Sequence, residues 1–201
     1  VPRLVPSFHE KYPNVELKIL ETAAQSFESL LLNGQVDFAI TNVISSRSEI
    51  KTELMRKYDF YLAMAKGHPL EEKGISREGK DRGRADIRAL AEEEFILQTP
   101  RQLTRSFADS VFARAQIKPR ILLEIQSIET AALLVSQGCG VCFIPGTHLQ
   151  LLHMADRLST YLLAGDAPKL DLGIAYLDGM YMPEYFEYFL ALCRSVLESD
   201  I

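Results

Sequence analysis

Residues 125–145 have the sequence IQSIETAALLVSQGCGVCFIP, and this stretch decides the fold class. Its order predicts a strand end, a polar turn, a helix, a glycine stop and a second buried strand. Ser127 can cap the helix, and Glu129 lies in the first turn, where the helix dipole favours negative charge. Gly138 fits the left-handed position past the helix end, and residues 141–144 form an apolar run typical of a parallel sheet. Backbone N–H groups at such a turn point into a cleft and favour an anionic small molecule.

The composition is that of an ordinary globular protein. The chain has 201 residues, of which 47% are hydrophobic and 24% charged, enough for one domain or two small ones. A formal net charge of −5 argues against this chain itself holding a nucleic-acid backbone. No apolar run approaches the roughly 18 residues that span a bilayer, and the start VPRLVP lacks the layout of a signal peptide. We therefore expect no association with a membrane.

Three cysteines are too few for a disulfide framework and favour a reducing, cytoplasmic location. Cys139 and Cys142 form a C-x-x-C pair, which admits a redox or metal-binding interpretation. No second pair exists, and His148 and His153 follow in a predicted helix, away from zinc-ligand spacing. The alternative is two small buried residues in a strand, so we expect no metal and no cofactor.

Apolar spacing predicts strands and helices in alternation along the chain. Residues 71–94 carry dense charge of both signs, which favours a solvated loop with a short helix at residues 86–91. The alternation predicts an α/β fold with mostly parallel sheets. Besides the opening unit, strands are expected at residues 15–19, 36–40, 54–65, 95–97, 161–163 and 172–177, and helices at residues 4–12, 27–31, 100–115 and 185–196.

In such sheets, ligands bind at the carboxyl ends of strands, where the chain changes direction. Thr22 and Thr99 each stand three residues before a glutamine, at capping-box spacing, and Pro100 then occupies the first helical position. Any one of these polar residues can be only a helix cap, whereas the whole set favours a binding site. The candidate turns are residues 22–26, 41–42, 99–102, 126–127 and 145–147.

Four short phrases stand in a fixed order along most of the chain. They are FHEKYPNVEL at residues 8–17, LLNGQVDFAI at residues 31–40, GHPL at residues 67–70, and the S-x-E-T, G-x-G and proline pattern of residues 127–145. Each phrase is loose alone, but four in order over about 140 residues are specific. In this respect the chain resembles the effector-binding domain of LysR-type transcriptional regulators.

The resemblance implies a two-lobed fold of the type 2 periplasmic-binding-protein kind, in which each lobe is a mostly parallel sheet flanked by helices. Two crossing strands would join the lobes, near residues 58–65 and 161–165. Lobe I would comprise residues 1–60 and 166–201, and lobe II residues 61–165. The family's winged helix-turn-helix DNA-binding domain and the first strand of lobe I would precede residue 1, so we expect a fragment of a longer regulator. The whole protein would contact DNA only through that domain and would form a homodimer or tetramer.

The resemblance also implies a small effector, expected to be a carboxylate, between the lobes. The family often has serine or threonine where Ala24 stands, so one expected hydroxyl is missing. Arg101 suits bidentate pairing with a carboxylate, and the alternative is a solvated surface arginine. The predicted effector-binding residues are Ala24, Gln25, Ser26, Thr41, Asn42, Thr99, Pro100, Arg101, Gln102, Ser127, Ile128, Pro145 and Gly146.

Three function classes follow from these observations. The leading hypothesis is a ligand-sensing domain that controls DNA binding or transcription. The alternative with the same fold is a solute-binding protein of a transporter, which predicts a signal peptide or lipid anchor upstream. An enzyme would need a nucleophile beside a base, and Ser127 has no histidine in a strand-end turn, His148 being the closest. We therefore expect no catalytic residues.

Overall fold

The structure, a computed structural model, describes residues 4–21, 27–42, 45–73, 75–76, 83–100, 102–152, 154 and 156–198. The chain divides into two compact units. Unit 1 consists of Val1–Lys57 and Asp171–Ile201, and unit 2 of Tyr58–Leu170. The chain therefore leaves unit 1 after residue 57 and returns to it at residue 171.

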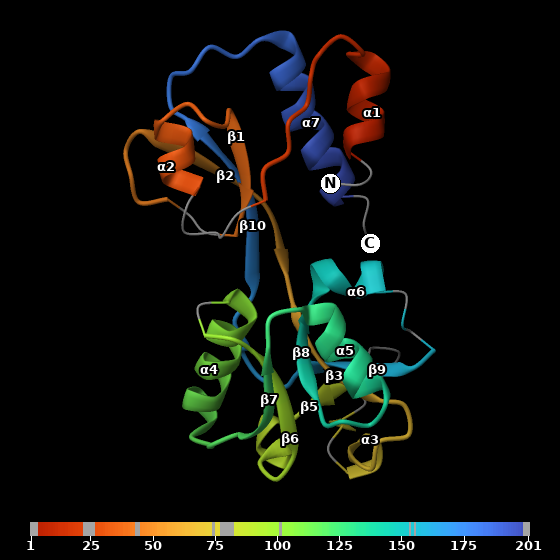
Figure 1. Cartoon of the computed structure of the whole chain (residues 1–201). Coiled ribbons are helices and arrows are strands. Elements are labelled where there is room, and N and C mark those ends of the chain that lie inside the picture. The colour runs from red at the N-terminus through yellow and green to blue at the C-terminus, as the bar shows by residue number, and fades with distance from the viewer. Residues whose placement is uncertain are drawn as a thin grey trace. The chain divides into compact units, whose positions relative to one another are not determined.

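Helices and strands alternate along the chain, so the expectation of an α/β fold is confirmed (Figure 1). None of the helices in the described part of the chain is long and apolar enough to cross a membrane. Unit 1 contains α1 (Leu4–Lys11), α2 (Phe27–Leu32), β1 (Phe38–Thr41), most of β2 (Ile50–Tyr58), most of β10 (Leu170–Leu177) and α7 (Glu184–Glu198). Unit 2 contains β3 (Phe60–Ala65), α3 (Leu70–Lys73), β4 (Ile75–Ser76), β5 (Arg84–Ala85), the 3-10 helix η2 (Ile87–Leu90), β6 (Glu94–Gln98), α4 (Leu103–Ala115), β7 (Arg120–Ile125), α5 (Ile128–Ser136), β8 (Cys142–Pro145), α6 (Gly146–Leu152) and β9 (Leu158–Leu163).

Unit 1 is built on a sheet of strand order β1–β10–β2 with helices on both faces. β1 pairs antiparallel with β10, in a register that runs from Phe38↔Tyr176 to Thr41↔Gly173. Because side chains alternate across a strand, Ile174 and Tyr176 of β10 pack with α1 and α7, whereas Ala175 packs with α2 on the other face.

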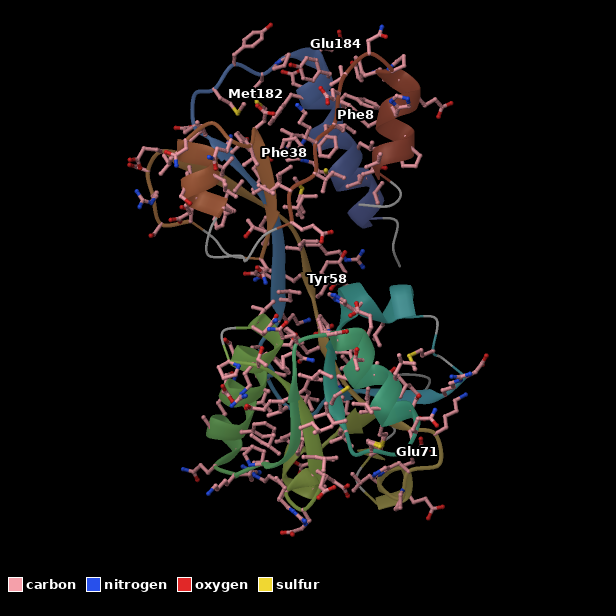
Figure 2. All side chains as sticks on the ribbon, in the orientation of Figure 1. Phe8, Phe38, Tyr58, Glu71, Met182 and Glu184 are labelled. Carbon is pink, nitrogen blue, oxygen red and sulfur yellow. The ribbon has the colours of Figure 1, made fainter. Side chains whose placement is uncertain are left out.

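Aromatic side chains fill the core between α1, α7 and the sheet (Figure 2). The ring of Phe189 lies 5.4 Å from that of Phe8 and 4.6 Å from that of Phe38, measured between centroids. Phe38 also meets Phe186 edge to face at 5.3 Å. One face of α7 is therefore core, and its residues Phe186, Phe189, Leu190 and Cys193 are buried.

Unit 2 contains a five-stranded sheet of order β4–β5–β9–β3–β8 and a two-stranded sheet β6–β7. A bridge joins the two sheets, because Ile96 N–H donates to the Val141 carbonyl and Val141 N–H donates to the Glu94 carbonyl, each at 2.9 Å. Leu62 and Met64 of β3 face the core shared with α4, and Ala63 between them faces α5. Helices thus cover both faces of this unit as well.

The expectation of mostly parallel sheets is wrong, because the pairings are mixed. β3 pairs antiparallel with both β8 and β9, whereas β6 pairs parallel with β7 and β5 parallel with β9. Parallel neighbours need a crossover connection, which α4 supplies between β6 and β7. β3 runs in the direction opposite to that of β8 and β9, and its hydrogen bonds to both strands are therefore antiparallel.

Two further local predictions differ from the structure. Residues 15–19 form no strand, since they have no hydrogen-bonded strand partner among the described residues. Their alternation reflects one-sided packing, in which Val15 and Leu17 contact the aromatic core and Ile19 is 62% exposed. The charged stretch 71–94 is more than a loop, because its described parts include α3, β4, β5 and η2.

The predicted start of α5 is confirmed, and the predicted start of α4 is wrong. Ser127 caps α5, since its Oγ accepts a hydrogen bond from Thr130 N–H at 3.0 Å. α4 instead begins at Leu103 with Gln102 at the N-cap, so Pro100 is not its first residue. Thr99 lies three residues before that N-cap and extends the β6–β7 ladder instead, since its N–H donates to the Ile125 carbonyl at 3.1 Å. The capping box predicted at Thr22 lies outside the described residues.

Two glycines follow α5. Gly138 ends the helix, and Gly140 lets the chain approach the backbone of β6 closely enough to form the bridge. Gly138 has the left-handed φ of +85° predicted for it, and its neighbour Cys139 donates to the Leu134 carbonyl at 3.1 Å. Gly140 also has a positive φ, of +81°, and passes so close to the backbone that a Cβ atom there would clash with the Glu94 carbonyl oxygen. Gly138 faces open space instead.

Replacing Gly140 with alanine is expected to lower the free energy of unfolding by about 3 kcal/mol or more, because strain at positive φ adds to a clash with the β6 backbone. Gly138→Ala is the matched control, with the same sign of φ and no clash, and should cost about 1–2 kcal/mol. Urea unfolding of both variants measures the difference. If both variants lost the same free energy of unfolding, the close approach of Gly140 to the Glu94 carbonyl would make no contribution to stability.

Candidate functional site

Three strand ends of unit 2 meet at one edge. β6 and β7 are parallel, with Gln98 opposite Ile125 at their carboxyl ends, and the bridge at Val141 sets β8 parallel to β6. α4, α5 and α6 each begin directly after one of these strands (Figure 1). The edge therefore gathers seven of the predicted site residues: Thr99, Pro100, Gln102, Ser127, Ile128, Pro145 and Gly146.

The other predicted residues do not all have a described position. Thr41 and Asn42 lie at the carboxyl end of β1 in unit 1, where Thr41 is buried and Asn42 half-buried. Ala24, Gln25, Ser26 and Arg101 lie outside the described residues.

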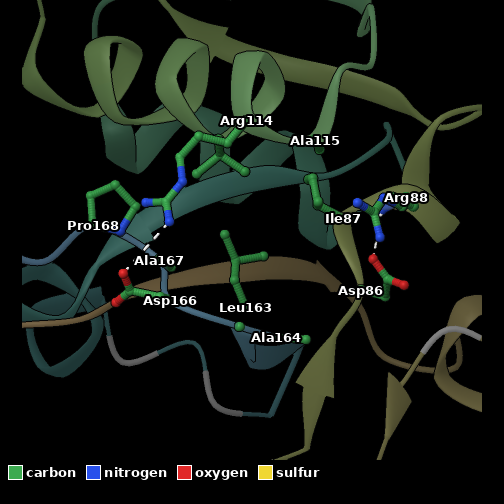
Figure 3. Close-up of a pocket in the computed structure, with 12 residues that line it drawn as sticks. Asp86, Ile87, Arg88, Arg114, Ala115, Leu163, Ala164, Asp166, Ala167 and Pro168 are labelled. Carbon is green, nitrogen blue, oxygen red and sulfur yellow. Dashed lines mark hydrogen bonds and ion pairs between the residues drawn. The ribbon is translucent and has the colours of Figure 1, made fainter.

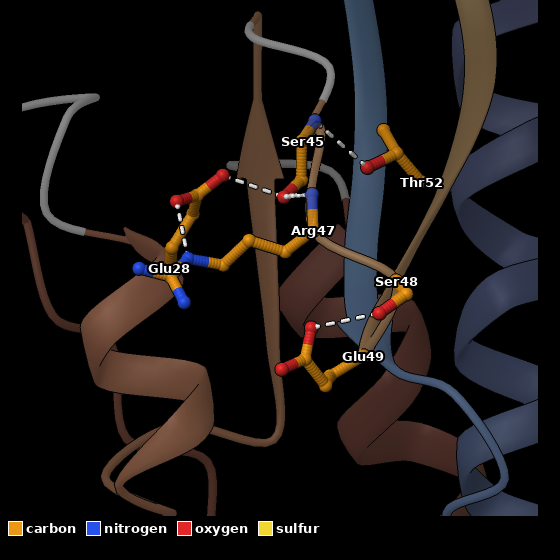
Figure 4. Close-up of polar contacts among 6 residues, drawn as sticks. All are labelled: Glu28, Ser45, Arg47, Ser48, Glu49 and Thr52. Atoms are coloured by element: carbon orange, nitrogen blue, oxygen red, sulfur yellow. Dashed lines mark hydrogen bonds and ion pairs between the residues drawn. The ribbon is translucent and has the colours of Figure 1, made fainter.

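Ser45 and Arg47, which precede β2 in unit 1, are anchored to α2 (Figure 4). Ser45 Oγ donates to Glu28 Oε1 at 2.5 Å, and Arg47 Nε donates to Glu28 Oε2 at 3.1 Å. The hydrogen bond from Ser45 lowers the pKa of Glu28, and Arg47 lowers it further. This carboxylate therefore stays ionised and holds Ser45 and Arg47 beside α2.

Ser127 and Glu129 form a hydrogen-bonded pair at the start of α5. Ser127 Oγ accepts from Thr130 N–H and donates to Glu129 Oε2 at 2.8 Å. The backbone N–H of Glu129 lowers the pKa of its own carboxyl group, followed by the Ser127 hydroxyl and the positive charge of His148 when protonated. The hydroxyl of Ser127 is thus engaged on both sides, its proton by the Glu129 carboxylate and its oxygen by the cap of α5.

Thr99 and Gln98 contribute uncommitted polar groups at the end of β6. The half-buried hydroxyl of Thr99 has no hydrogen-bond partner in the described part of the chain. Gln98 is 2% exposed, and its side-chain Nε2 is buried without a partner among the described residues. Such an orphaned donor costs about 1–3 kcal/mol. The sequence analysis missed Gln98, although a glutamine ending the apolar run FIL was a visible signal.

His148 is the second residue that the sequence analysis did not place at this edge. It lies in the first turn of α6, and its Nδ1 is 3.0 Å from Thr147 Oγ1. Burial lowers the pKa of His148, and attraction to Glu129 acts in the opposite direction. The edge therefore contains a neutral imidazole facing an ionised carboxylate near neutral pH.

The cysteines of the C-x-x-C pair are both unbonded thiols. Cys142 is fully buried in β8, and burial raises the pKa of its thiol to about 12, so it stays protonated and unreactive. Among the described residues, no group of three or more histidine, cysteine, aspartate or glutamate side chains could hold a metal ion.

An NMR titration of the His148 ring should give a pKa below the about 6.5 of a free histidine, because burial disfavours the imidazolium. Glu129→Gln should lower this pKa further by removing the attraction. Since the folded-state pKa lies below the unfolded-state value, the unfolded chain binds more protons between the two, and stability falls as the pH falls through that range. His148→Gln should remove this part of the pH dependence. A pKa that rises in Glu129→Gln would contradict the described pair.

Comparisons with known proteins agree on one family. The model of the LysR substrate binding domain matches residues 1–198. The HTH-type transcriptional regulator YybE of Bacillus subtilis (strain 168) is 25% identical over 191 residues, which are 94% of this chain and 61% of that protein. The chain spans between 48% and 61% of the length of the first curated relatives it matches, all of which are transcriptional regulators.

Solved structures show the same fold. The regulatory domain of CcmR from Synechocystis PCC6803, in complex with 2-PG, has a TM-score of 0.81 at 21% identity and covers 99% of this chain and 91% of its own. The effector-binding domain of QuiR, in complex with shikimate, has a TM-score of 0.74 at 19% identity, covering 100% and 91%. The predicted type 2 periplasmic-binding-protein-like architecture is thereby confirmed.

Proposed function

The chain belongs to the LysR substrate binding domain family, and on this basis we propose that it is the ligand-sensing regulatory domain of a transcriptional regulator. Units 1 and 2 correspond to the two regulatory lobes of this proposal, and the effector contacts the shared strand ends of unit 2. A winged helix-turn-helix domain elsewhere in the whole protein supplies DNA binding in the cytoplasm, and the chain itself catalyses no reaction. The relatives are transcriptional regulators, which favours this function over the transporter alternative.

The observation that carries the proposal is the shared edge of β6, β7 and β8. The starts of α4 and α5 present backbone N–H groups there, and helix N-termini favour anions. Thr99 has an unpaired hydroxyl, and the side chain of the N-cap residue Gln102 makes no capping hydrogen bond. Together these donors suit a small carboxylate, in line with the small molecules bound by QuiR and CcmR. An effector that binds one lobe arrangement better than the other shifts the equilibrium between them.

The first experiment is thermal unfolding of the purified chain against a panel of small metabolites weighted toward carboxylates. A ligand at about 100 times its dissociation constant adds roughly 2.7 kcal/mol, which shifts the midpoint by about 2–4 °C or more. A saturable shift with at least one carboxylate is the expected result. A neutral or cationic ligand that alone gives such a shift would contradict the carboxylate class.

For a confirmed effector, Thr99→Ala should weaken binding about tenfold by removing a free donor, with little change in unfolding temperature. Ser127→Asn is the companion variant, because asparagine keeps the cap of α5 while changing the polar group that faces the edge. Thr160→Ala, on β9, is the matched control and should bind normally. Normal effector binding by both site variants, measured by calorimetry, would contradict the proposed site.

We also propose that the regulator is a homodimer or tetramer. β7 pairs with β6 on one side and has no strand neighbour on the other within the described residues. Its side chains Ile121, Leu122 and Leu123 are 42–44% exposed, and Leu133 of α5 is 50% exposed. An apolar open strand edge favours pairing with another copy.

Leu122→Lys should weaken self-association of this chain at least about tenfold, because a charge on the open edge opposes pairing. Tyr181→Lys is the control, since Tyr181 is 84% exposed in the segment before α7 and lies outside the edge. Sedimentation measures both variants. An unchanged dimer in Leu122→Lys would exclude this edge from the interface.

A further inference from the structure

Unit 2 contains a pocket at the C-terminal end of α4. It is distant from the shared edge of β6, β7 and β8, which is the proposed effector site and is called the effector edge below. Its volume is about 240 Å³, and all twelve lining residues belong to unit 2. α4 begins at the effector edge, and the pocket is lined by Arg114 and Ala115 in its last turn. A helix of 13 residues is about 20 Å long, so the two sites lie at opposite ends of α4.

The middle of the pocket is apolar and its two ends are charged (Figure 3). Val111, Leu163 and Ile87 provide the apolar surface, the first two of them buried. Arg114 and Asp166 lie at one end and Asp86 and Arg88 at the other. The ligand that fits this pattern has an apolar body and a polar head.

The charges at the two ends are not equivalent. Arg114 and Asp166 pair with each other at 3.6 Å and so balance one another. At the other end, Asp86 Oδ1 accepts from the backbone N–H of Arg88 at 2.9 Å as the cap of η2. Within the described residues, neither Asp86 Oδ2 nor the Arg88 guanidinium has a partner. Asp86 and Arg88 are both exposed, so a carboxylate oxygen and a guanidinium at this end of the pocket are each available to a ligand.

We propose that this pocket binds an α-amino acid with an apolar side chain. The ammonium group pairs with the Asp86 carboxylate, the carboxylate group pairs with the Arg88 guanidinium, and the side chain lies on Leu163 and Val111. A single charge of either sign would leave one of the two protein charges unpaired, whereas a zwitterion satisfies both. The volume, below the roughly 300–1,000 Å³ of drug-sized sites, suits a molecule of this size.

The position of the pocket allows a bound amino acid to influence the segment that connects unit 2 to unit 1. Residues 164–168 line it and form the connection from β9 to β10, which carries the chain back to unit 1. Gly165 in this connection has a φ of +80°. An amino acid packed against the connection stabilises one of its conformations, in addition to any effector bound at the edge.

The test is an NMR amide titration of the whole 201-residue chain with L-phenylalanine as the probe. Saturable shifts are expected at the amides of Ile87, Arg88, Ala115, Ala164, Gly165 and Ala167. Phenylacetate, which lacks the ammonium group, and phenethylamine, which lacks the carboxylate, should each bind at least about fivefold more weakly. Equal affinity for all three molecules would overturn the zwitterion assignment.

Two variants and a control complete the test. Arg88→Gln and Asp86→Asn should each weaken L-phenylalanine binding about fivefold or more, and asparagine still caps η2, so the fold is kept. Arg157→Gln, an exposed arginine in the turn before β9, should change the affinity by less than about twofold. The proposal is overturned if no saturable shift occurs at the pocket amides or if both pocket variants bind like the wild type. Shifts confined to Thr99, Gln102 and Ser127 would overturn it too, since they place the probe at the effector edge.

Discussion

The pair of hydrogen bonds between β6 and Val141 is the constraint on which unit 2 depends. Val141 N–H donates to the Glu94 carbonyl and Ile96 N–H donates to the Val141 carbonyl, and only glycine at position 140 lets the chain come this close. This contact attaches the β6–β7 pair to the five-stranded sheet and aligns β8 with β6. The edge at which α4, α5 and α6 begin follows from that alignment. The candidate effector site therefore depends on a backbone contact made about 10 Å back along β6 and about 13 Å back along β8, given the strand rise of about 3.3 Å per residue.

Electrostatics at that edge separates structural from ligand-binding groups. The Ser127 hydroxyl accepts the capping hydrogen bond of α5 and donates to Glu129, and the Glu129 carboxylate interacts electrostatically with His148. Thr99 and the buried Gln98 amide remain without partners in the described part of the chain. Unpaired buried polar groups cost folding free energy, and a ligand that engages them recovers it. The same reasoning distinguishes the pocket at the other end of α4, where Arg88 and one Asp86 oxygen are unpaired while Arg114 and Asp166 neutralise each other.

Local signals in the sequence were reliable where one short segment decides the outcome. Ser127 and Gly138 begin and end α5 as predicted, because capping and positive φ depend on neighbouring residues only. Signals that depend on a distant partner failed. Thr99 has good capping spacing, yet its N–H is taken by Ile125 across the sheet, so α4 starts three residues after the predicted position of its first residue. Residues 15–19 alternate like a strand but have no strand partner among the described residues.

The sequence by itself determined the α/β class, the family resemblance and most of the polar residues at the strand ends, because each rests on periodicity or on short motifs. Only the tertiary structure decided which strand ends share an edge, since this requires the mixed pairings around β3 and the bridge at Val141. It also decided that Gln98 is buried without a partner and that Asp86, Arg88 and Leu163 meet in one pocket. Those facts join residues as far apart in the chain as Tyr61 and Leu162, and no local pattern encodes contacts over such separations.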